Sequence, residues 1–240
     1  MALKILITND DGINAPSLIP LAEFAKKLGD VVVIAPKYEQ SGKSHAIDFF
    51  GEIEIKQVFL TEGVRAYSVD STPADCVRYG YLGLHEKFDV VISGINKGFN
   101  LGRDIVYSGT AGAVFEAARL GMKGIAISTA PSSFETAINS LDRLYSFFVT
   151  NSLLEINDIY NVNIPLNATK IKFTHLGRIY YTDSFVEKRE NIYVQKGKVM
   201  QYSESDDGSD IDTVSSGIIS ITPLSAERTE KNALQKLLSL

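Results

Sequence analysis

Two adjacent carboxylates follow directly on an apolar strand near the start of the chain. Leu3 and the run from Ile5 to Ile7 are apolar on both faces of that strand, as expected for a parallel strand covered by helices on both sides. Ligands of such sheets bind outside the carboxyl ends of the strands. Asp10 and Asp11 would repel each other at this place, and a divalent cation is the simplest remedy. An isolated Asp-Asp-Gly segment is equally consistent with solvated caps of the next helix, so the choice depends on the rest of the chain.

Two further strand ends supply the same kind of donor atom. The apolar strand that ends at Ala35 leads to Ser41, and the one that ends at Ser93 leads to Asn96. Together with the two aspartates these are hard oxygen donors, the set that Mg²⁺, Mn²⁺ and Ca²⁺ prefer. Zinc is disfavoured, because the three histidines show no ligand spacing and the chain has one cysteine.

A turn suited to binding an anion precedes one of the predicted helices. The segment Tyr107–Thr110 leads directly into it, so unpaired backbone N–H groups and the positive end of the helix dipole would face the site. Four glycines between residues 94 and 109 let the backbone approach a ligand closely, and Asn96 and Asn100 add hydrogen-bond donors for phosphate oxygens. A flexible surface loop is the alternative interpretation.

A metal ion beside an anion site indicates phosphoryl chemistry. The ion would polarise a phosphoryl oxygen and lower the pKa of its bound water, which makes a hydroxide nucleophile. Two common nucleotide-binding motifs do not fit the sequence. The segment Ser41–Ser44 imitates the end of a P-loop, but Lys37 stands where that motif needs glycine. The loop Asn9–Gly12 is not the glycine triplet of dinucleotide-binding folds.

Strands and helices alternate over the first two thirds of the chain. This alternation predicts an α/β fold with a doubly wound, mostly parallel, Rossmann-like sheet and right-handed crossovers. Thr72 and Pro73 have the residue types of an N-cap and a first helical position. The predicted strands cover residues 3–7, 31–35, 89–93 and 124–128, and a hairpin-like stretch covers 53–69. The predicted helices cover 16–28, a segment that begins at 73, 111–120 and 135–150, and Gly29 is expected to end the first of them.

The character of the sequence changes from about residue 174. Residues 179–202 are rich in tyrosine and charge and predict an extended hairpin, and the acidic stretch 203–217 predicts a loop. A strand over 218–223 and a short leucine-bearing helix over 230–238 follow. We therefore expect a single α/β domain over 1–240, with an extension of hairpin and helical arm over about 174–240.

Composition limits the classes of partner and compartment. The chain has 240 residues and a net charge of −5, which gives no broad attraction to polymeric nucleic acid or to an anionic membrane surface. No stretch approaches the roughly 20 apolar residues of a membrane span, and the N-terminus has no signal-peptide pattern. The single cysteine indicates a reducing compartment, so the predicted location is the cytoplasm.

At this point the chain resembles a known family, the survival protein E (SurE) nucleotidases. The resemblance covers nearly the whole chain, and its segments are specific in combination although each is weak alone. The matching segments are 8–12 (TNDDG), 35–36 with 40–42 (AP and QSG), 72–77 (TPADCV), 93–102 (SGINKGFNLG), 107–110 (YSGT) and 220–224 (SITPL).

The resemblance implies a metal-dependent phosphomonoesterase acting on nucleoside monophosphates. This would be a 5′-nucleotidase, with 3′-nucleotides left open as substrates, that uses a metal-bound water to hydrolyse the ester. The implied cofactor is one divalent cation, Mg²⁺ or Mn²⁺, with Ca²⁺ as a substitute in crystals. Its implied ligands are Asp10, Asp11, Ser41 and Asn96, of which Asp10, Asp11 and Asn96 count as catalytic. The predicted phosphate-binding residues are Asn9, Gly42, Asn100, Ser108, Gly109 and Thr110.

Three other functions remain as alternatives. A haloacid-dehalogenase-like phosphatase needs a nucleophilic aspartate two residues before a second one, and that position is Asn9, which cannot form an aspartyl-phosphate. A nucleotide-sugar transferase would use Asp10 and Asp11 to clamp a metal-bound diphosphate, and a nucleotide-sensing module would bind without turnover. The sequence assigns no base or sugar preference and no general acid.

The C-terminal third also predicts self-association. A two-stranded hairpin is marginal in water, and the terminal helix with Leu234, Leu237 and Leu238 is too short to be stable alone. Arms of this kind are exchanged between protomers at low cost. We expect a homodimer, or a tetramer built through the C-terminal segments, and the family resemblance implies the same. The alternative is that both elements fold back on their own subunit.

Overall fold

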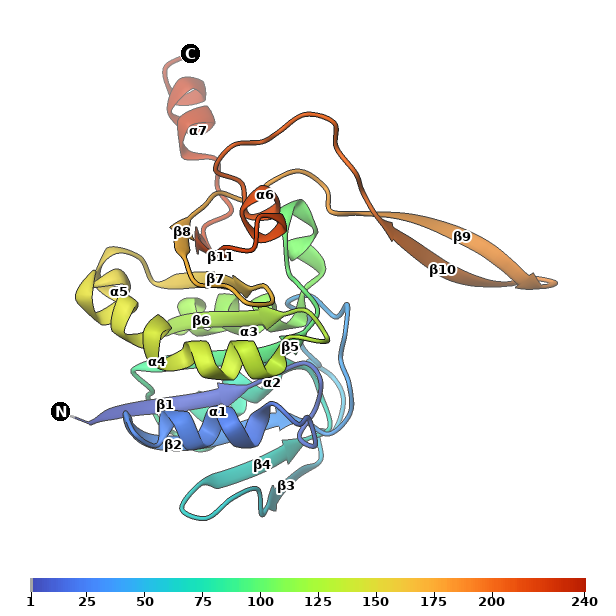
Figure 1. Cartoon of the computed structure of the whole chain (residues 1–240). Coiled ribbons are helices and arrows are strands. Elements are labelled where there is room, and N and C mark those ends of the chain that lie inside the picture. The colour runs from blue at the N-terminus through green and yellow to red at the C-terminus, as the bar shows by residue number, and fades with distance from the viewer. Residues whose placement is uncertain (1) are drawn as a thin grey trace.

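The computed structural model describes residues 2–240, and its centre is a nine-stranded sheet (Figure 1). Within these residues the middle of the sheet is parallel, in the order β4-β2-β1-β5-β6-β7. At one edge β3 pairs antiparallel with β4, and at the other β11 pairs antiparallel with β7 and parallel with β8. The strands are β1 (Leu3–Thr8), β2 (Gly29–Pro36), β3 (Ile55–Val58), β4 (Arg65–Val69), β5 (Val90–Lys97), β6 (Lys123–Thr129), β7 (Ile159–Ile164), β8 (Ile171–Phe173) and β11 (Ile219–Leu224).

The strand order reverses on either side of β1. The chain passes from β1 to β2 and β4 on one side, and then crosses to β5, β6 and β7 on the other. The carboxyl ends of β1 and β5 therefore meet at a topological switch point, where doubly wound sheets bind their ligands. The predicted fold class is confirmed.

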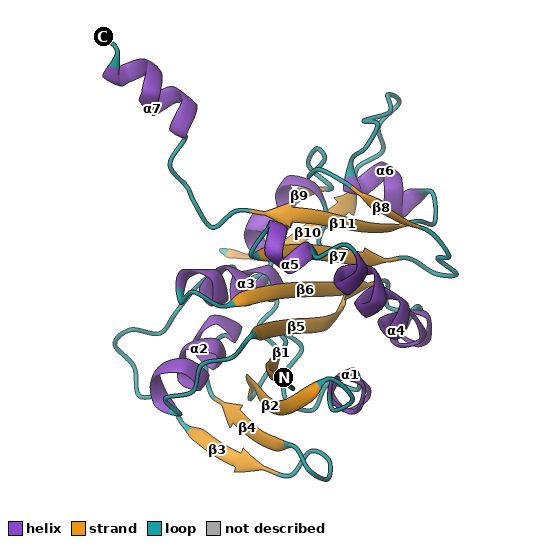
Figure 2. Cartoon of the chain, turned by 90° about the vertical axis from the view of Figure 1, so that its left-hand side faces the viewer, coloured by secondary structure: helices purple, strands orange, loops and turns teal. Residues whose placement is uncertain are grey.

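Helices cover both faces of the sheet (Figure 2). On one face lie α1 (Leu18–Ala25) and α4 (Phe134–Thr150), and on the other α2 (Pro73–Arg78) and α3 (Gly109–Arg119). Each face has its own buried apolar cluster: Ile5 and Ile7 belong to the first and Leu6 to the second. The strand β1 is apolar at each of these three positions because neither of its faces is exposed to water.

The C-terminal third adds elements outside the main sheet. β9 (Tyr181–Arg189) and β10 (Ile192–Val199) pair antiparallel into a hairpin that projects from the body (Figure 1). The final helix α7 (Lys231–Leu238) also stands away from the sheet, and none of its residues is buried. The remaining short helices are η1 (Tyr79–Gly83), η2 (Gly102–Tyr107), α5 (Leu153–Ile156) and α6 (Asp210–Ser215). None of the helices in residues 2–240 is long and apolar enough to cross a membrane.

Several element boundaries differ from the predicted ones. Gly29 does not stop a helix but begins β2, where a Cβ would lie 1.8 Å from the carbonyl oxygen of Leu3. The predicted glycine-rich loop after Ser93 contains regular secondary structure, because β5 continues to Lys97 and the short helix η2 follows. The predicted loop 203–217 contains α6, whose N-cap Ser209 accepts a hydrogen bond from the N–H of Asp212. The strands β7 and β8 have no counterpart among the predicted elements.

Candidate functional site

The turn after β1 positions the two adjacent aspartates. The amide of Asn9 closes this turn: Nδ2 donates to the carbonyl of Gly12 at 3.0 Å, and Oδ1 accepts from the N–H of Gly12 at 3.1 Å. Gly12 has a φ of +95°, which favours glycine. The sequence predicts a phosphate contact for Asn9, but its side chain is fully buried and engaged in the turn. Its role in the structure is therefore to hold Asp10 and Asp11 in place.

The carboxylate of Asp10 is almost completely buried. Its Oδ1 accepts a hydrogen bond from Oγ1 of Thr110 at 2.8 Å, so one of the two carboxylate oxygens is fixed by α3. Burial, together with the neighbouring charge of Asp11, raises the pKa of Asp10 from 3.8 to about 6 against the lowering effect of the Thr110 hydrogen bond. A cation bound beside this carboxylate would favour its charged form.

Asp11 and Asn96 lie where β1 and β5 end. Oδ2 of Asp11 accepts the N–H of Lys97 at 3.2 Å, which ties the two strand ends together. Burial raises the pKa of Asp11, the Lys97 N–H lowers it, and the charge of Glu39 raises it. Nδ2 of Asn96 donates to the carbonyl of Gly98 at 2.8 Å, so the amide oxygen remains to coordinate an ion.

One cavity of about 230 Å³ brings together most of the predicted site residues. Asp10 lines it from β1, Ser41 and Gly42 from the loop after β2, and Asn96 from the end of β5. Asn100 and Ser108 line it too, whereas Asp11 lies outside the set of described residues that form its wall. The hydroxyl of Ser41 donates to Glu39 at 2.8 Å.

The predicted anion-binding turn is the N-terminus of α3. Ser108 is its N-cap and accepts the N–H of Ala111 at 3.0 Å, which leaves the N–H groups of Gly109 and Thr110 outside the helical hydrogen bonds. A Cβ at Gly109 would lie 3.1 Å from Cβ of Asp10, so the helix end packs directly against the aspartate. The side chain of Thr110 is fully buried on Asp10, and its backbone N–H also acts on the Asp10 carboxylate and lowers the pKa of that group.

A group of asparagines supports the loop around Asn100. Nδ2 of Asn161 and of Asn163, both fully buried on β7, donate to the carbonyl of Asn100 at 2.8 and 2.9 Å. The N–H of Asn100 donates to Oδ1 of Asn163, and its Nδ2 donates to Oγ of Ser128. Two asparagines within an otherwise apolar strand are the signal that could have revealed this support.

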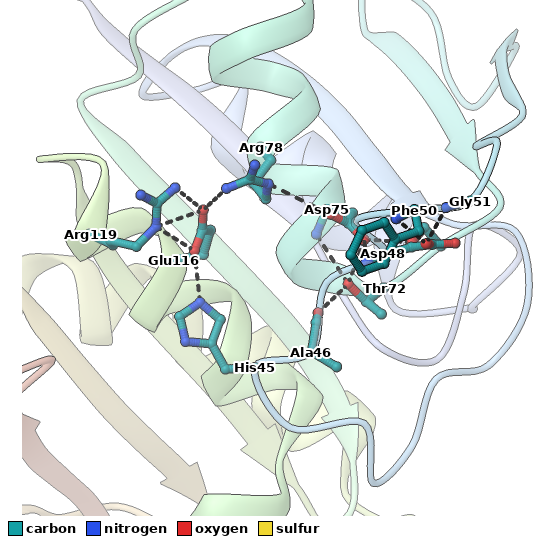
Figure 3. Close-up of polar contacts among 11 residues, drawn as sticks. His45, Ala46, Asp48, Phe50, Gly51, Thr72, Asp75, Arg78, Glu116 and Arg119 are labelled. Carbon is teal, nitrogen blue, oxygen red and sulfur yellow. Dashed lines mark hydrogen bonds and ion pairs between the residues drawn. The ribbon is translucent and has the colours of Figure 1, made fainter. Parts of the chain in front are cut away.

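The loop that carries Ser41 is anchored on the helices of the second face (Figure 3). A ring nitrogen of His45 lies 2.8 Å from Oε2 of Glu116, whose carboxylate also accepts from Arg78 and Arg119. Burial raises the pKa of Glu116, but the hydrogen bonds from His45, Arg119 and Arg78 outweigh it and lower this pKa to about 2. The charged Glu116 is therefore a firm attachment point for the loop.

Further contacts hold the same loop to the start of α2 (Figure 3). The carboxylate of Asp75 accepts the N–H of Asp48 at 2.7 Å, and the hydroxyl of Thr72 donates to the carbonyl of Ala46 at 2.7 Å. Thr72 also accepts the N–H of Asp75 as the N-cap of α2, which confirms the predicted cap. Together with His45 these contacts fix the path of the chain beyond Ser41 and Gly42.

The donor set fits a hard divalent cation. Within the described residues no group of three or more histidine, cysteine, aspartate or glutamate side chains is placed to hold a metal, so serine and asparagine oxygens would have to complete the set. Two carboxylates, a hydroxyl and an amide oxygen, together with the raised pKa of the buried Asp10, match Mg²⁺ or Mn²⁺.

Several residues of the cavity wall are not predicted by the sequence patterns. Lys97 and Phe99 belong to the motif around Asn96 but were not assigned a role, and Tyr107 directly precedes the anion-binding turn. Tyr181 and Asp183 enter the cavity from β9, more than seventy residues further along the chain. No local sequence pattern indicates that the hairpin begins at the site.

Comparisons with known proteins identify the family of this chain. The model of the family described as "Survival protein SurE" matches residues 5–183. A relative named 5′-nucleotidase SurE from Thermoanaerobacter sp. (strain X514) is 39% identical over 249 residues, covering 98% of this chain and 97% of the relative. Another of that name, from Caldanaerobacter subterraneus subsp. tengcongensis, is 38% identical and covers 98% and 96%.

The fold has a solved counterpart as well. The crystal structure of the SurE protein from Aquifex aeolicus matches with a TM-score of 0.76 and 29% identity, covering 98% of both chains. The resemblance inferred from the motifs is thus confirmed over nearly the full length. This chain belongs to the survival protein SurE family.

Proposed function

We propose that this protein is a phosphatase of nucleoside monophosphates that depends on one divalent cation, Mg²⁺ or Mn²⁺. The observation that carries the proposal is the convergence of Asp10, Ser41 and Asn96 with Ser108 in one cavity at the switch point of the sheet. The names of the relatives, 5′-nucleotidase SurE, support 5′-nucleotides as substrates. A 3′-phosphate presents the same group to the same donors, so 3′-nucleotides belong in the substrate panel.

The cation would be held by Asp10, Asp11, Ser41 and Asn96. When bound, it supplies a Lewis acid for a phosphoryl oxygen and lowers the pKa of water. Thr110 holds Oδ1 of Asp10 and so directs the remaining carboxylate oxygen. Because Asn96 donates from Nδ2 to Gly98, its amide oxygen is the atom available for coordination.

The phosphate would be bound at the N-terminus of α3. The N–H of Gly109 and the hydroxyl of Ser108 would donate to its oxygens, with the N–H of Thr110 shared with Asp10, and the helix dipole favours its negative charge. Lys97 and Gly42 line the same cavity, and the Lys97 ammonium adds positive charge for the transition state. Asp104 lines the cavity as well, but its Oδ2 accepts the N–H groups of Tyr180 and Tyr181 and so anchors the hairpin.

The proposed reaction has no phosphoenzyme intermediate. The position that a haloacid-dehalogenase-like phosphatase fills with a nucleophilic aspartate is Asn9, which is buried in the turn. The sole cysteine, Cys76, is fully buried, and burial raises its thiol pKa far above the usual range. With a substrate whose phosphorus is made chiral by sulfur and oxygen isotopes, a single direct attack by labelled water should therefore invert the configuration, whereas a phosphoenzyme route would retain it. A trapped phosphorylated side chain would overturn this direct attack.

The decisive experiment is a panel of metals against nucleoside monophosphates. Enzyme stripped with EDTA should release no phosphate, and Mg²⁺ or Mn²⁺ should restore release while Zn²⁺ should not. Phosphate release at the full rate in EDTA would contradict the metal site. Tight binding of nucleotide without release at any metal concentration would instead support a nucleotide-sensing module.

We also propose that the protein is a homodimer or a dimer of dimers formed through its C-terminal segments, in the cytoplasm. The support for assembly is exposed apolar surface on both arms. Phe185 on the hairpin is 75% exposed, and Leu237 and Leu238 on α7 are 63% and 79% exposed. The buried, unpaired Cys76 is in keeping with a reducing compartment.

A further inference from the structure

Three aromatic side chains line the cavity without a role in the phosphate chemistry, and two of them, Tyr107 and Tyr181, are tyrosines on its rim. Tyr107 comes from the end of η2, and Tyr181 is the first residue of β9. They are 63% and 40% exposed, so a large aromatic surface faces the cavity and solvent. A divalent cation and a phosphate need neither ring.

The position of Tyr181 is fixed by its neighbours. Its backbone N–H donates to Oδ2 of Asp104 at 2.6 Å, and the N–H of Tyr180 donates to the same oxygen at 2.7 Å. The rings of Tyr180 and Tyr181 pack edge to face, with centroids 4.8 Å apart. Tyr107 is held too, because its carbonyl accepts the N–H of Ser44 at 3.0 Å. The backbone that carries each ring is thus held in place at the cavity wall.

The base of the hairpin is fastened to the site loop at a second place. The buried carboxylate of Asp210 accepts the N–H groups of Gly102 and Gly177, both at 2.9 Å. The N–H of Arg103 donates to the carbonyl of Arg178 at 3.0 Å. At Gly102, with a φ of +57°, a Cβ would lie 1.9 Å from that same carbonyl, so only glycine allows this approach. The approach of β9 to the cavity is therefore a built feature of the fold.

The charges in the cavity orient an anionic ligand. Asp183 lines the cavity two residues after Tyr181, on the same face of β9. Asp10 would be neutralised by the cation and Asp104 accepts two backbone N–H groups, so Asp183 is the carboxylate of this wall left to repel a phosphate, while the N-terminus of α3 attracts one. A nucleotide would therefore place its phosphate toward Ser108 and its neutral base toward the tyrosines.

We infer that Tyr181 and Tyr107 form the nucleobase subsite of this enzyme and determine its preference for nucleotides over other phosphomonoesters. The inference rests on the proposed nucleotidase function. Aromatic rings stack on every base, because each base has a π-face, so the subsite selects for a base rather than for one base. Asp104 is a positioning residue that acts through Tyr181.

The test compares AMP with ribose 5-phosphate, which lacks the base. We expect Tyr181→Leu to lower the ratio of kcat/KM for AMP to that for ribose 5-phosphate by about tenfold or more, because stacking on the base is lost. Tyr181→Phe keeps the ring and should keep the ratio, which makes it the matched control. An unchanged ratio in Tyr181→Leu, or an equal loss in both variants, would overturn the inference.

A binding measurement separates this inference from the proposed function. If the wild type releases phosphate from neither compound, nucleotidase activity is ruled out, and calorimetry with adenosine then tests the subsite directly. Weaker adenosine binding by Tyr181→Leu than by Tyr181→Phe would support the subsite in that case. Equal binding by the two variants would overturn it.

Discussion

Asp10 combines a catalytic assignment with a cost to the fold. Its folded pKa of about 6 exceeds the ordinary value of 3.8, so the metal-free folded state holds the proton more tightly than the unfolded chain does. The contribution of Asp10 to the free energy of unfolding is then fully present below about pH 4 and is lost as the pH rises through about 6. This contribution is on the order of 3 kcal/mol. Bound cation should offset this loss, since it favours the carboxylate.

Asp10→Asn should therefore abolish phosphate release and yet stabilise the metal-free protein. The asparagine keeps an acceptor for Thr110 but carries no charge to desolvate. We expect the metal-free variant to unfold at higher denaturant concentration than metal-free wild type at pH 8, with the difference vanishing near pH 4. Urea titrations in EDTA at the two pH values measure it. Full activity of this variant would remove Asp10 from the site.

Gly109 has no room for a side chain against Asp10. A Cβ there would approach Cβ of Asp10 to 3.1 Å, Oδ2 to 3.2 Å and the carbonyl of Gln40 to 3.3 Å. Gly109→Val should displace both the aspartate and the N-terminus of α3, raising KM and lowering kcat together. Steady-state kinetics with AMP, alongside circular dichroism to verify folding, measure this effect. If both constants stay at wild-type values, the turn is only a helix cap.

At the level of single residues, sequence patterns predict the oxygen donors that lie at or after the carboxyl ends of strands. Asp10, Ser41 and Asn96 could be located because parallel strands deliver the residues at their carboxyl ends to one edge, and Ser108 because it directly precedes a helix. The same patterns assign Asn9 to phosphate, since a short amide next to aspartates looks the same whether it binds a ligand or closes a turn. Tyr181 could not be located, because the path of the hairpin depends on tertiary contacts such as the one with Asp104.

The next scale is the element, and here Glu116 of α3 holds the loop that carries Ser41. Its pKa is lowered from 4.5 to about 2, so its stabilising contribution is present above about pH 4.5 and is lost as the pH falls toward 2. The difference corresponds to roughly 3 kcal/mol. Acid should therefore release the loop as well as weaken the fold.

We expect Glu116→Gln to reduce the free energy of unfolding by about 3 kcal/mol at pH 7 and by much less near pH 2.5. It should also raise KM, because the loop bearing Ser41 and Gly42 loses its attachment to α3. Glu135→Gln, at an exposed position of α4, is the matched control and should change neither quantity. An equal effect of Glu116→Gln at both pH values would show that its charge is not what holds the loop.

Local patterns predict elements well where burial is uniform and poorly where tertiary contacts decide. The strands β1, β2 and β5 each contain a continuous apolar run, at residues 5–7, 31–35 and 90–92, and the start of α2 is fixed by Thr72 and Pro73. β7 was missed because Asn161 and Asn163, which support the site loop, interrupt its apolar pattern. The helix α6 was missed because Asp210 is held by Gly102 and Gly177, which are distant in the sequence.

For the whole molecule, the exposed hairpin β9–β10 and helix α7 predict that the particle in solution contains more than one chain. Sedimentation at micromolar concentration should give a multiple of 26.3 kDa. Leu237→Glu with Leu238→Glu, and separately Phe185→Glu, should shift the protein toward the monomer by placing charge in a buried contact. Lys236→Glu, on the same helix, is the control for charge alone. A wild-type monomer would contradict the assembly, and removal of the residues after Leu224 should change its size or its solubility.

The shared carboxylate of Asp104 links quaternary structure to turnover. It belongs to η2, immediately before the phosphate-binding turn, yet it holds the first residue of a hairpin proposed to reach into another protomer. A displacement of the hairpin would therefore also displace Asp104 and the cavity wall next to the phosphate-binding turn. The specific activity on AMP should fall on dilution below the dissociation constant of the assembly, and the loss should be smaller for ribose 5-phosphate, which does not use Tyr181. The specific activity of this enzyme would then depend on its own concentration.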